Sequence, residues 1–132
     1  MQSRAFGVAN RIMAMLFLIS AIIQFNDPDP VRWAVIYGAA GFACLAAGRF
    51  RYSWPLPTGV GLVALVWAAG LSPILSSVRL SDLARSMHAE TPSIELGREF
   101  LGLLIVLGWM VFLMVVSLRE RSSQAKSGEI RN

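Results

Sequence analysis

The chain has 132 residues, a length typical of one domain, and 55% of them are hydrophobic while only 15% are charged. Soluble domains carry roughly 25% charged residues, so this composition excludes an ordinary soluble globular protein. The net charge of +4 does not indicate nucleic-acid binding. The basic residues flank apolar runs, whereas a nucleic-acid surface presents them as a stripe with interleaved aromatic residues.

Charged residues are absent from four long stretches of the chain: 12–26, 33–48, 52–78 and 100–118. Runs of this length cross a hydrocarbon core of ~30 Å as helices that rise ~1.5 Å per residue. Strands are not indicated because the apolar residues do not alternate, and in lipid a helix satisfies every backbone amide internally. We therefore predict an all-α integral membrane four-helix bundle over residues 1–120, with helices at about 5–25, 30–49, 55–75 and 92–119.

The first predicted helix, 5–25, ends in the segment QFNDPDPVRW (24–33). A plain turn explains most of this segment. Asn26 tolerates the left-handed conformation that ends helices, Asp29 accepts hydrogen bonds from the amides of the next helix, and Pro30 suits its first position. The turn does not explain Asp27, so the segment is also a candidate for function.

The second predicted helix, 30–49, carries small residues at four-residue spacing. They form two rows: Ala39, Ala43 and Ala47, and Ala40, Cys44 and Gly48. Such rows let helix backbones approach closely in lipid, where packing drives association. The pattern predicts helix contacts, with the single Cys44 as a packing residue. We place Trp33 in an aromatic belt at the membrane surface.

The third predicted helix, 55–75, begins in WPLP (54–57), because proline fits a first helical turn. Trp67 near its middle and Trp109 near the middle of the fourth helix are expected to fill the bundle interior, with contact to a buried ligand as the alternative.

The connection that follows has apolar residues at helical spacing, with charged residues between them: Leu80, Leu83, Ala84 and Met87. This pattern predicts a short interfacial helix between helices 3 and 4, lying on the outer membrane surface. Thr91-Pro92 indicates the start of the fourth helix. One side of that helix is expected to face the bundle: Glu95, Glu99, Gly102, Val106, Trp109 and Leu113.

The basic residues predict the orientation, because loops rich in Lys and Arg stay in the cytoplasm. Eight fall on one side: Arg4, Arg11, Arg49, Arg51, Arg119, Arg121, Lys126 and Arg131. Four fall on the other: Arg32, Arg79, Arg85 and Arg98. Both termini are therefore predicted to be cytoplasmic, and residues 120–132 form a cytoplasmic polar tail.

This topology brings the first loop and the start of the fourth helix to the same outer face. The candidate ligand site or structural polar cluster there comprises Asn26, Asp27, Asp29, Glu95, Arg98 and Glu99. Carboxylates on a bundle-facing side need a partner or a proton, because a buried unpaired charge is costly. Three solutions stay open: pairing with Arg98 and Arg32, protonation or bonding through water to Gln24 and Asn26, and a divalent cation. Asp27, Asp29, Glu95 and Glu99 are the candidate metal ligands, since oxygen-rich sites suit such cations.

The segments QFNDPDPVRWAVIYG (24–38) and ELGREFLGLLIVLGW (95–109) resemble the transmembrane protein 220 family of small multi-pass proteins. The positions that match the family pattern are Asn26, Asp27, Pro28, Asp29, Trp33, Tyr37, Gly97, Arg98 and Glu99. The two segments cover about thirty residues, and the rest of the chain agrees only in hydropathy and helix count. The resemblance implies a four-helix membrane protein and brings no established activity.

The leading functional interpretation is a non-enzymatic accessory protein, scaffold or modulator of membrane partners, without a cofactor. The sequence carries no nucleophile–base pair, phosphate loop or metal motif of diagnostic spacing. The expected partners are the lipid bilayer and a membrane protein or a second copy of the chain, in a bacterial inner membrane. One alternative is a membrane-embedded enzyme or sensor that binds a divalent cation at the outer carboxylates. A small transporter is the second alternative, disfavoured because no ionisable group lies in the central part of a helix.

Overall fold

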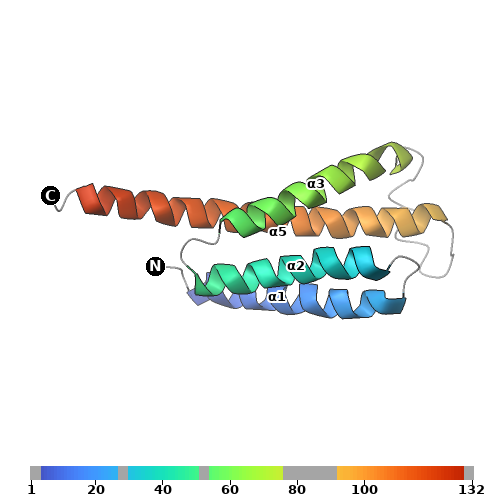
Figure 1. Cartoon of the computed structure of the whole chain (residues 1–132), viewed down its shortest axis with the longest axis horizontal. Coiled ribbons are helices and arrows are strands. Elements are labelled where there is room, and N and C mark those ends of the chain that lie inside the picture. Colours follow the sequence, from blue (N-terminus) through green and yellow to red (C-terminus); the bar gives the residue numbers. More distant parts are fainter. Residues whose placement is uncertain (1–3, 27–29, 51–53, 76–91, 130–132) are drawn as a thin grey trace.

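The computed structural model describes residues 4–26, 30–50, 54–75 and 92–129, and all regular structure in these ranges is helical. The elements in chain order are α1 (Arg4–Ile23), the 3-10 turn η1 (Gln24–Asn26), α2 (Pro30–Arg49), α3 (Pro55–Leu75) and α5 (Pro92–Glu129) (Figure 1). Three of the four long helices begin at a proline, whose fixed φ suits the first helical position and whose missing N–H costs nothing there.

The bounds of α2 and α3 are those predicted from the sequence, and α5 begins where predicted. Its end is different, because α5 continues to Glu129 and not to about 119. The polar segment after Leu118 consists largely of good helix formers, so the helix persists after the apolar run has ended. The predicted interfacial helix falls within 76–91 and lies outside the described residues.

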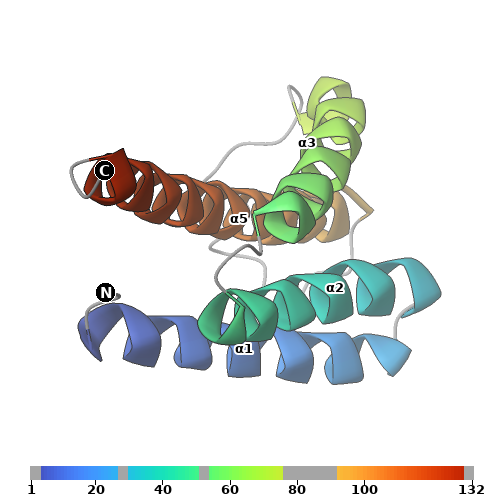
Figure 2. The same cartoon turned by 60° about the vertical axis from the view of Figure 1, so that its left-hand side comes forward.

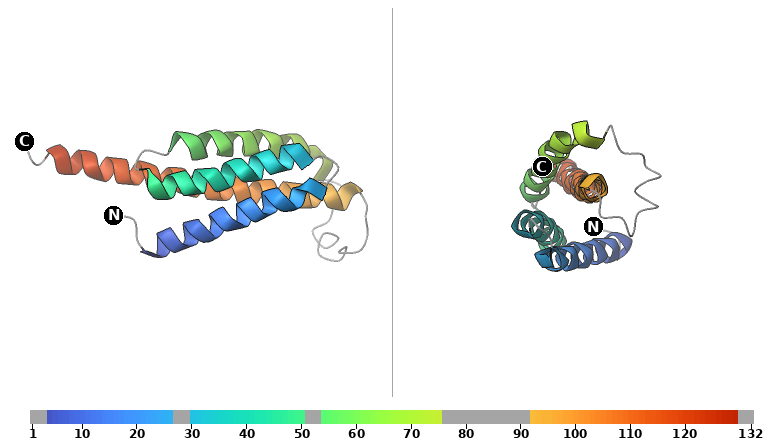
Figure 3. Two further views of the ribbon diagram at one scale, coloured as in Figure 1. Left: turned by 60° about the horizontal axis from the view of Figure 1, so that its bottom comes forward. Right: turned by 90° about the vertical axis from the view of Figure 1, so that its right-hand side faces the viewer.

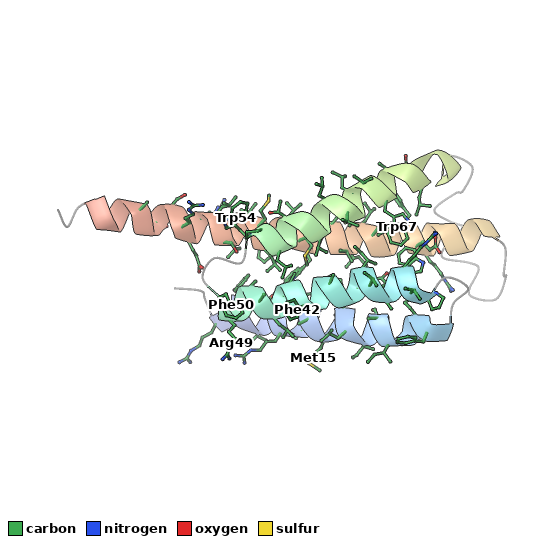
Figure 4. The ribbon with its side chains drawn as sticks, in the orientation of Figure 1. Met15, Phe42, Arg49, Phe50, Trp54 and Trp67 are labelled. Carbon is green, nitrogen blue, oxygen red and sulfur yellow. The ribbon has the colours of Figure 1, made fainter. Side chains whose placement is uncertain are left out.

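Four helices in the described ranges are long and apolar enough to cross a membrane. The qualifying windows are Arg4–Ile23, Pro30–Arg49, Pro55–Ser72 and Gly97–Ser123. Large apolar side chains cover the outward faces of these helices, as Met15 on α1 and Phe42 on α2 illustrate with 63% and 62% exposure (Figure 4). A surface of this kind suits contact with lipid hydrocarbon and not with water.

The helices run antiparallel and define two ends of the molecule (Figure 1). We call the end that contains the start of α1, the end of α2 and the end of α5 the terminal end. The distal end contains η1 and the starts of α2 and α5. The last turns of α5 project beyond the other helices at the terminal end (Figure 1).

The bundle consists of two helix pairs, α1 with α2 and α3 with α5 (Figure 2). The end-on view shows α2 between α1 and α3, and α2 also contacts α5 (Figure 3). As a result α2 supplies the close backbone contacts between the two pairs.

Small residues on α2 occupy the centre of the bundle. Ala40, Ala43 and Cys44 are fully buried, as the four-residue rows of the sequence predicted. At Gly41 an added Cβ would lie 2.8 Å from Cγ of Leu18 on α1, so this glycine permits the close approach of the two helices. Gly61 on α3 has the same role toward α5, where an added Cβ would lie 3.2 Å from Cβ of Met110.

Candidate functional site

Two described members of the predicted polar cluster, Arg98 and Glu99, are carried by α5 near its start, at the distal end. The turn η1 and the start of α2, which flank residues 27–29 in the sequence, lie at the same end (Figure 1). This arrangement of backbone is the one that the predicted topology requires.

The side chains of the cluster are described only in part. Asp27 and Asp29 lie outside the described residues, as do the side chains of Asn26 and Glu95. Among the rest, Arg98 is exposed and Glu99 is half-buried. The convergence of the six residues, and with it any choice between ion pairing and a cation, stays a prediction.

The side of α5 that faces the bundle is shifted from the predicted one. The most deeply buried positions at spacings of three and four are Leu103, Val106, Met110, Leu113 and Ser117. Val106 and Leu113 were predicted correctly, whereas Gly102 and Trp109 are half-buried and flank this stripe. Glu99, four residues before Leu103, lies near the same side. Its half-buried state agrees with the expectation that this carboxylate is not fully solvated.

Beneath the distal end lies an aromatic cluster of Phe17, Trp33, Tyr37 and Trp67. Trp33 on α2 stacks on Trp67 of α3 with ring centroids 4.7 Å apart, and it lies 6.0 Å from the ring of Tyr37. Phe17 of α1 stacks on Tyr37 at 6.4 Å. The prediction that Trp33 lies in a surface belt was wrong, because its side chain is 3% exposed. Stacking on Trp67 draws it into the bundle although it is only one turn from the start of α2.

Gly102 is the residue of α5 that lies against Tyr37 of this cluster. A Cβ at Gly102 would collide with the hydroxyl of Tyr37, which reaches across from α2. The absence of a side chain at Gly102 is therefore a steric requirement of the contact between the two helix pairs, and it fixes where Tyr37 lies beneath the start of α5.

The sequence analysis missed two buried polar residues, Ser117 of α5 and Asn10 of α1, which are 8% and 3% exposed. Asn10 makes contacts between helices. Its Nδ2 donates a hydrogen bond of 2.7 Å to the carbonyl oxygen of Cys44, and its Oδ1 accepts one of 3.4 Å from Nε1 of Trp109. A carbonyl only accepts and an indole N–H only donates, so the orientation of the amide is determined by its partners. Asn10 thereby connects α1 with both α2 and α5.

A second aromatic group surrounds Asn10. Trp109 lies 5.1 Å from Phe112 between ring centroids, and Phe112 lies 5.9 Å from Phe6 of α1. The expectation that Trp109 faces the interior is met by its half-buried side chain and its bond to Asn10. The signal for Asn10 in the sequence was a single amide next to an apolar run, which in lipid requires a hydrogen-bond partner.

Within the part of the chain that the structure describes, no group of three or more His, Cys, Asp or Glu side chains is placed to hold a metal ion. Cys44 is fully buried, and its thiol lies beside Trp109 in the bundle interior.

Two comparisons place the chain among known proteins. A family described as "Transmembrane family 220, helix" matches residues 16–115, a range that includes both segments of the resemblance noted above. Transmembrane protein 220 of Xenopus laevis is 30% identical over 134 residues, which cover 98% of this chain and 66% of the relative. The chain thus spans just under two-thirds of the length of that relative. No solved structure matches the chain.

Proposed function

Because the chain belongs to transmembrane family 220 and is a membrane protein with helices long enough to span the bilayer, we propose that it is an accessory or scaffold subunit. In this role it binds other membrane proteins, or a second copy of itself, through its lipid-facing helix surfaces. The proposal assigns no chemical step to the chain.

The observation that carries the proposal is the filled interior of the described bundle. Side chains from α2, α3 and α5 have no exposed surface there: Ala40, Ala43, Cys44, Ala64, Leu103, Val106 and Leu113. Buried side chains thus fill the space between these helices at these positions, which disfavours the passage of a solute there. Contacts with other molecules therefore fall to the outer surfaces and the two ends.

The proposal includes a location and an orientation. We place the chain in a bacterial inner membrane as a four-helix bundle with both termini in the cytoplasm and a short interfacial helix within 76–91. The asymmetry of Arg and Lys supports the orientation. The relative named above is a frog protein, so the comparisons give no support to the bacterial membrane.

Cation binding by Asp27, Asp29, Glu95 and Glu99, in an enzyme or a sensor, is the alternative proposal. The half-buried Glu99 is the one described side chain among these four. A transporter is the weaker alternative, because the filled interior opposes it.

The scaffold proposal is tested by photo-crosslinking in native membranes. A photoreactive amino acid replaces one lipid-facing residue at a time: Ile19 on α1, Val66 on α3 and Ile105 on α5, which are 48%, 66% and 57% exposed. We expect at least one of these positions to yield a discrete adduct with a protein partner or with a second copy of the chain. A scaffold surface faces one direction, so the adduct should depend on the position.

The three positions are each other's controls, because all three lie on lipid-facing helix surfaces. Lipid adducts alone from every position would refute the proposal, as would a diffuse set of protein adducts equal at all three.

A further inference from the structure

A pocket with a volume of about 530 Å³ lies between α1 and α2 at the terminal end. This volume is within the ~300–1,000 Å³ typical of small-molecule sites. Arg4 and Arg11 line it from α1, and Arg49 lines it from the last turn of α2. The pocket is at the opposite end of the bundle from the predicted carboxylate cluster, so it is a separate feature.

The pocket is cationic. Arg4 and Arg11 are seven residues apart, which places both on one face of α1, and Arg49 projects from the adjoining end of α2 (Figure 4). Among the described residues, no acidic side chain lines the pocket. Three guanidinium groups around one space present a set of donors that matches the oxygens of a phosphate group.

Two glycines keep this space open. A Cβ at Gly7, between the two arginines of α1, would meet no atom within 4 Å. On the facing helix, a Cβ at Gly48 would lie 3.6 Å from Nδ2 of Asn10. Larger residues at these positions would occupy the pocket.

A buried hydrogen-bond donor forms part of the pocket wall. Asn10 lines the pocket although it is 3% exposed. Its amide nitrogen carries two hydrogens, and one of them is donated to the carbonyl of Cys44. The pocket wall thus includes an amide nitrogen with the capacity for a second hydrogen bond.

The position of Arg11 favours an anion in the pocket. Arg11 lies ~10 Å along the helix axis from Arg4, between the lipid-facing side chains of Val8 and Ile12, which are 57% and 52% exposed. A guanidinium among apolar side chains is costly unless it reaches water or an anion. A phosphate at this level neutralises it without displacing the helix.

We propose that this pocket binds the phosphate of an anionic phospholipid, held by Arg4, Arg11 and Arg49 and by the amide of Asn10. The acyl chains of the lipid extend along the apolar outer surface formed by Ile12 and Leu45. Basic pockets between membrane helices bind anionic headgroups for the same electrostatic reason. A soluble phosphate shares the headgroup chemistry but lacks the acyl chains, and the experiment distinguishes the two sources.

The experiment measures the melting temperature of the full chain, purified in phosphatidylcholine–detergent micelles, while phosphatidylglycerol is added. We expect phosphatidylglycerol to raise the melting temperature in a saturable manner. The double variant Arg11→Gln/Arg49→Gln should require about tenfold more phosphatidylglycerol, because it loses two charge-assisted contacts. Gly7→Leu should weaken the effect as strongly by filling the pocket without a change in charge.

Matched variants identify the site. Arg121→Gln removes an exposed charge from α5 and Gly59→Leu adds a side chain where a Cβ meets no atom within 4 Å, so both should respond as the wild type does. An equal response in all variants, or none in the wild type, would overturn the proposal. If inorganic phosphate alone reproduces the full shift, the lipid source is wrong.

Discussion

Asn10 is a polar residue at the junction of three helices. Its amide receives a hydrogen bond from Trp109 of α5 and donates one to the backbone of α2. A hydrogen bond between membrane helices contributes about 0.6 kcal/mol on average and up to ~1.7 kcal/mol. Its energetic contribution is therefore modest, but its geometry fixes the rotation of α1 against two neighbours at once.

Replacing Asn10 by leucine tests this role. Asn10→Leu retains a side chain of similar size and removes both bonds, so the free energy of unfolding should fall by about 1 kcal/mol. Ser72→Ala is the control, because the Ser72 hydroxyl is exposed and bonds only within its own helix. Unfolding by SDS in mixed micelles measures the difference, and an Asn10→Leu protein as stable as Ser72→Ala would contradict the expectation.

The partners of Asn10 could not be found from the sequence. Cys44 and Trp109 are 34 and 99 residues away along the chain, and nothing in a hydropathy pattern pairs one helix face with another. The same limit applies to Trp33. A tryptophan near a helix start suits the membrane surface equally well, and only the presence of Trp67 on α3 places it inside.

At the scale of helices, the contact of α2 with α5 joins the two pairs of the bundle. Tyr37 crosses from α2 to the surface of α5 at Gly102. Its ring also contacts Phe17 of α1 and Trp33 of its own helix. Tyr37 is thus one of the side chains that set how closely the α1–α2 pair approaches the α3–α5 pair.

A pair of substitutions tests this contact. Gly102→Ala should destabilise the protein by about 1–3 kcal/mol, because the new methyl group displaces the Tyr37 hydroxyl. In a Tyr37→Phe background the same substitution should cost less, since the hydroxyl is absent and the next atom, Cζ, lies 3.3 Å from the added Cβ. The test is a double-mutant cycle of SDS unfolding free energies.

Gly108→Ala is the control for that cycle, because a Cβ there meets no atom within 4 Å. It should be neutral or slightly stabilising, as alanine favours a helix over glycine. Additive effects of Gly102→Ala and Tyr37→Phe would show that the two residues are not in contact.

Helix positions were largely predictable, and one helix end was not. Proline at residues 30, 55 and 92 indicated helix starts that the structure places at the same residues. The end of α5 was missed because hydropathy registers where the apolar run stops, while residues 119–129 keep a helical backbone with polar side chains. The predicted bundle-facing side of α5 differs from the observed one, because Trp109 and Gly102 were assigned to it and lie at the edges of the buried stripe.

For the whole molecule, the two ends differ in their chemistry. Arg4, Arg11 and Arg49 surround a pocket at the terminal end, whereas Glu99, the described carboxylate of the candidate cluster, belongs to the distal end. The placement of the helix starts at that end was predictable, because successive apolar spans that cross a membrane alternate in direction. The side-chain geometry of the cluster was not, since Asp27 and Asp29 each precede a proline and stand outside any apolar run whose periodicity could assign them to a helix face.

The orientation of the molecule can be measured directly. A reporter that fluoresces only in the cytoplasm, fused after Asn132, should be active, because the basic residues concentrate at the terminal end. A phosphatase that is active only outside the cytoplasm is the matched fusion at the same site, and it should be silent. The reverse result would place the pocket of Arg4, Arg11 and Arg49 on the outer side of the membrane.

The uninterrupted course of α5 has a mechanical consequence. Its 38 residues correspond to a rod of about 57 Å, well beyond the ~30 Å of a hydrocarbon core. Because the membrane span and the turns that project beyond it form one continuous helix, a group attached after the end of α5 is held at a fixed distance from the bilayer. A rotation of the membrane-spanning part about its axis would rotate that attachment by the same angle.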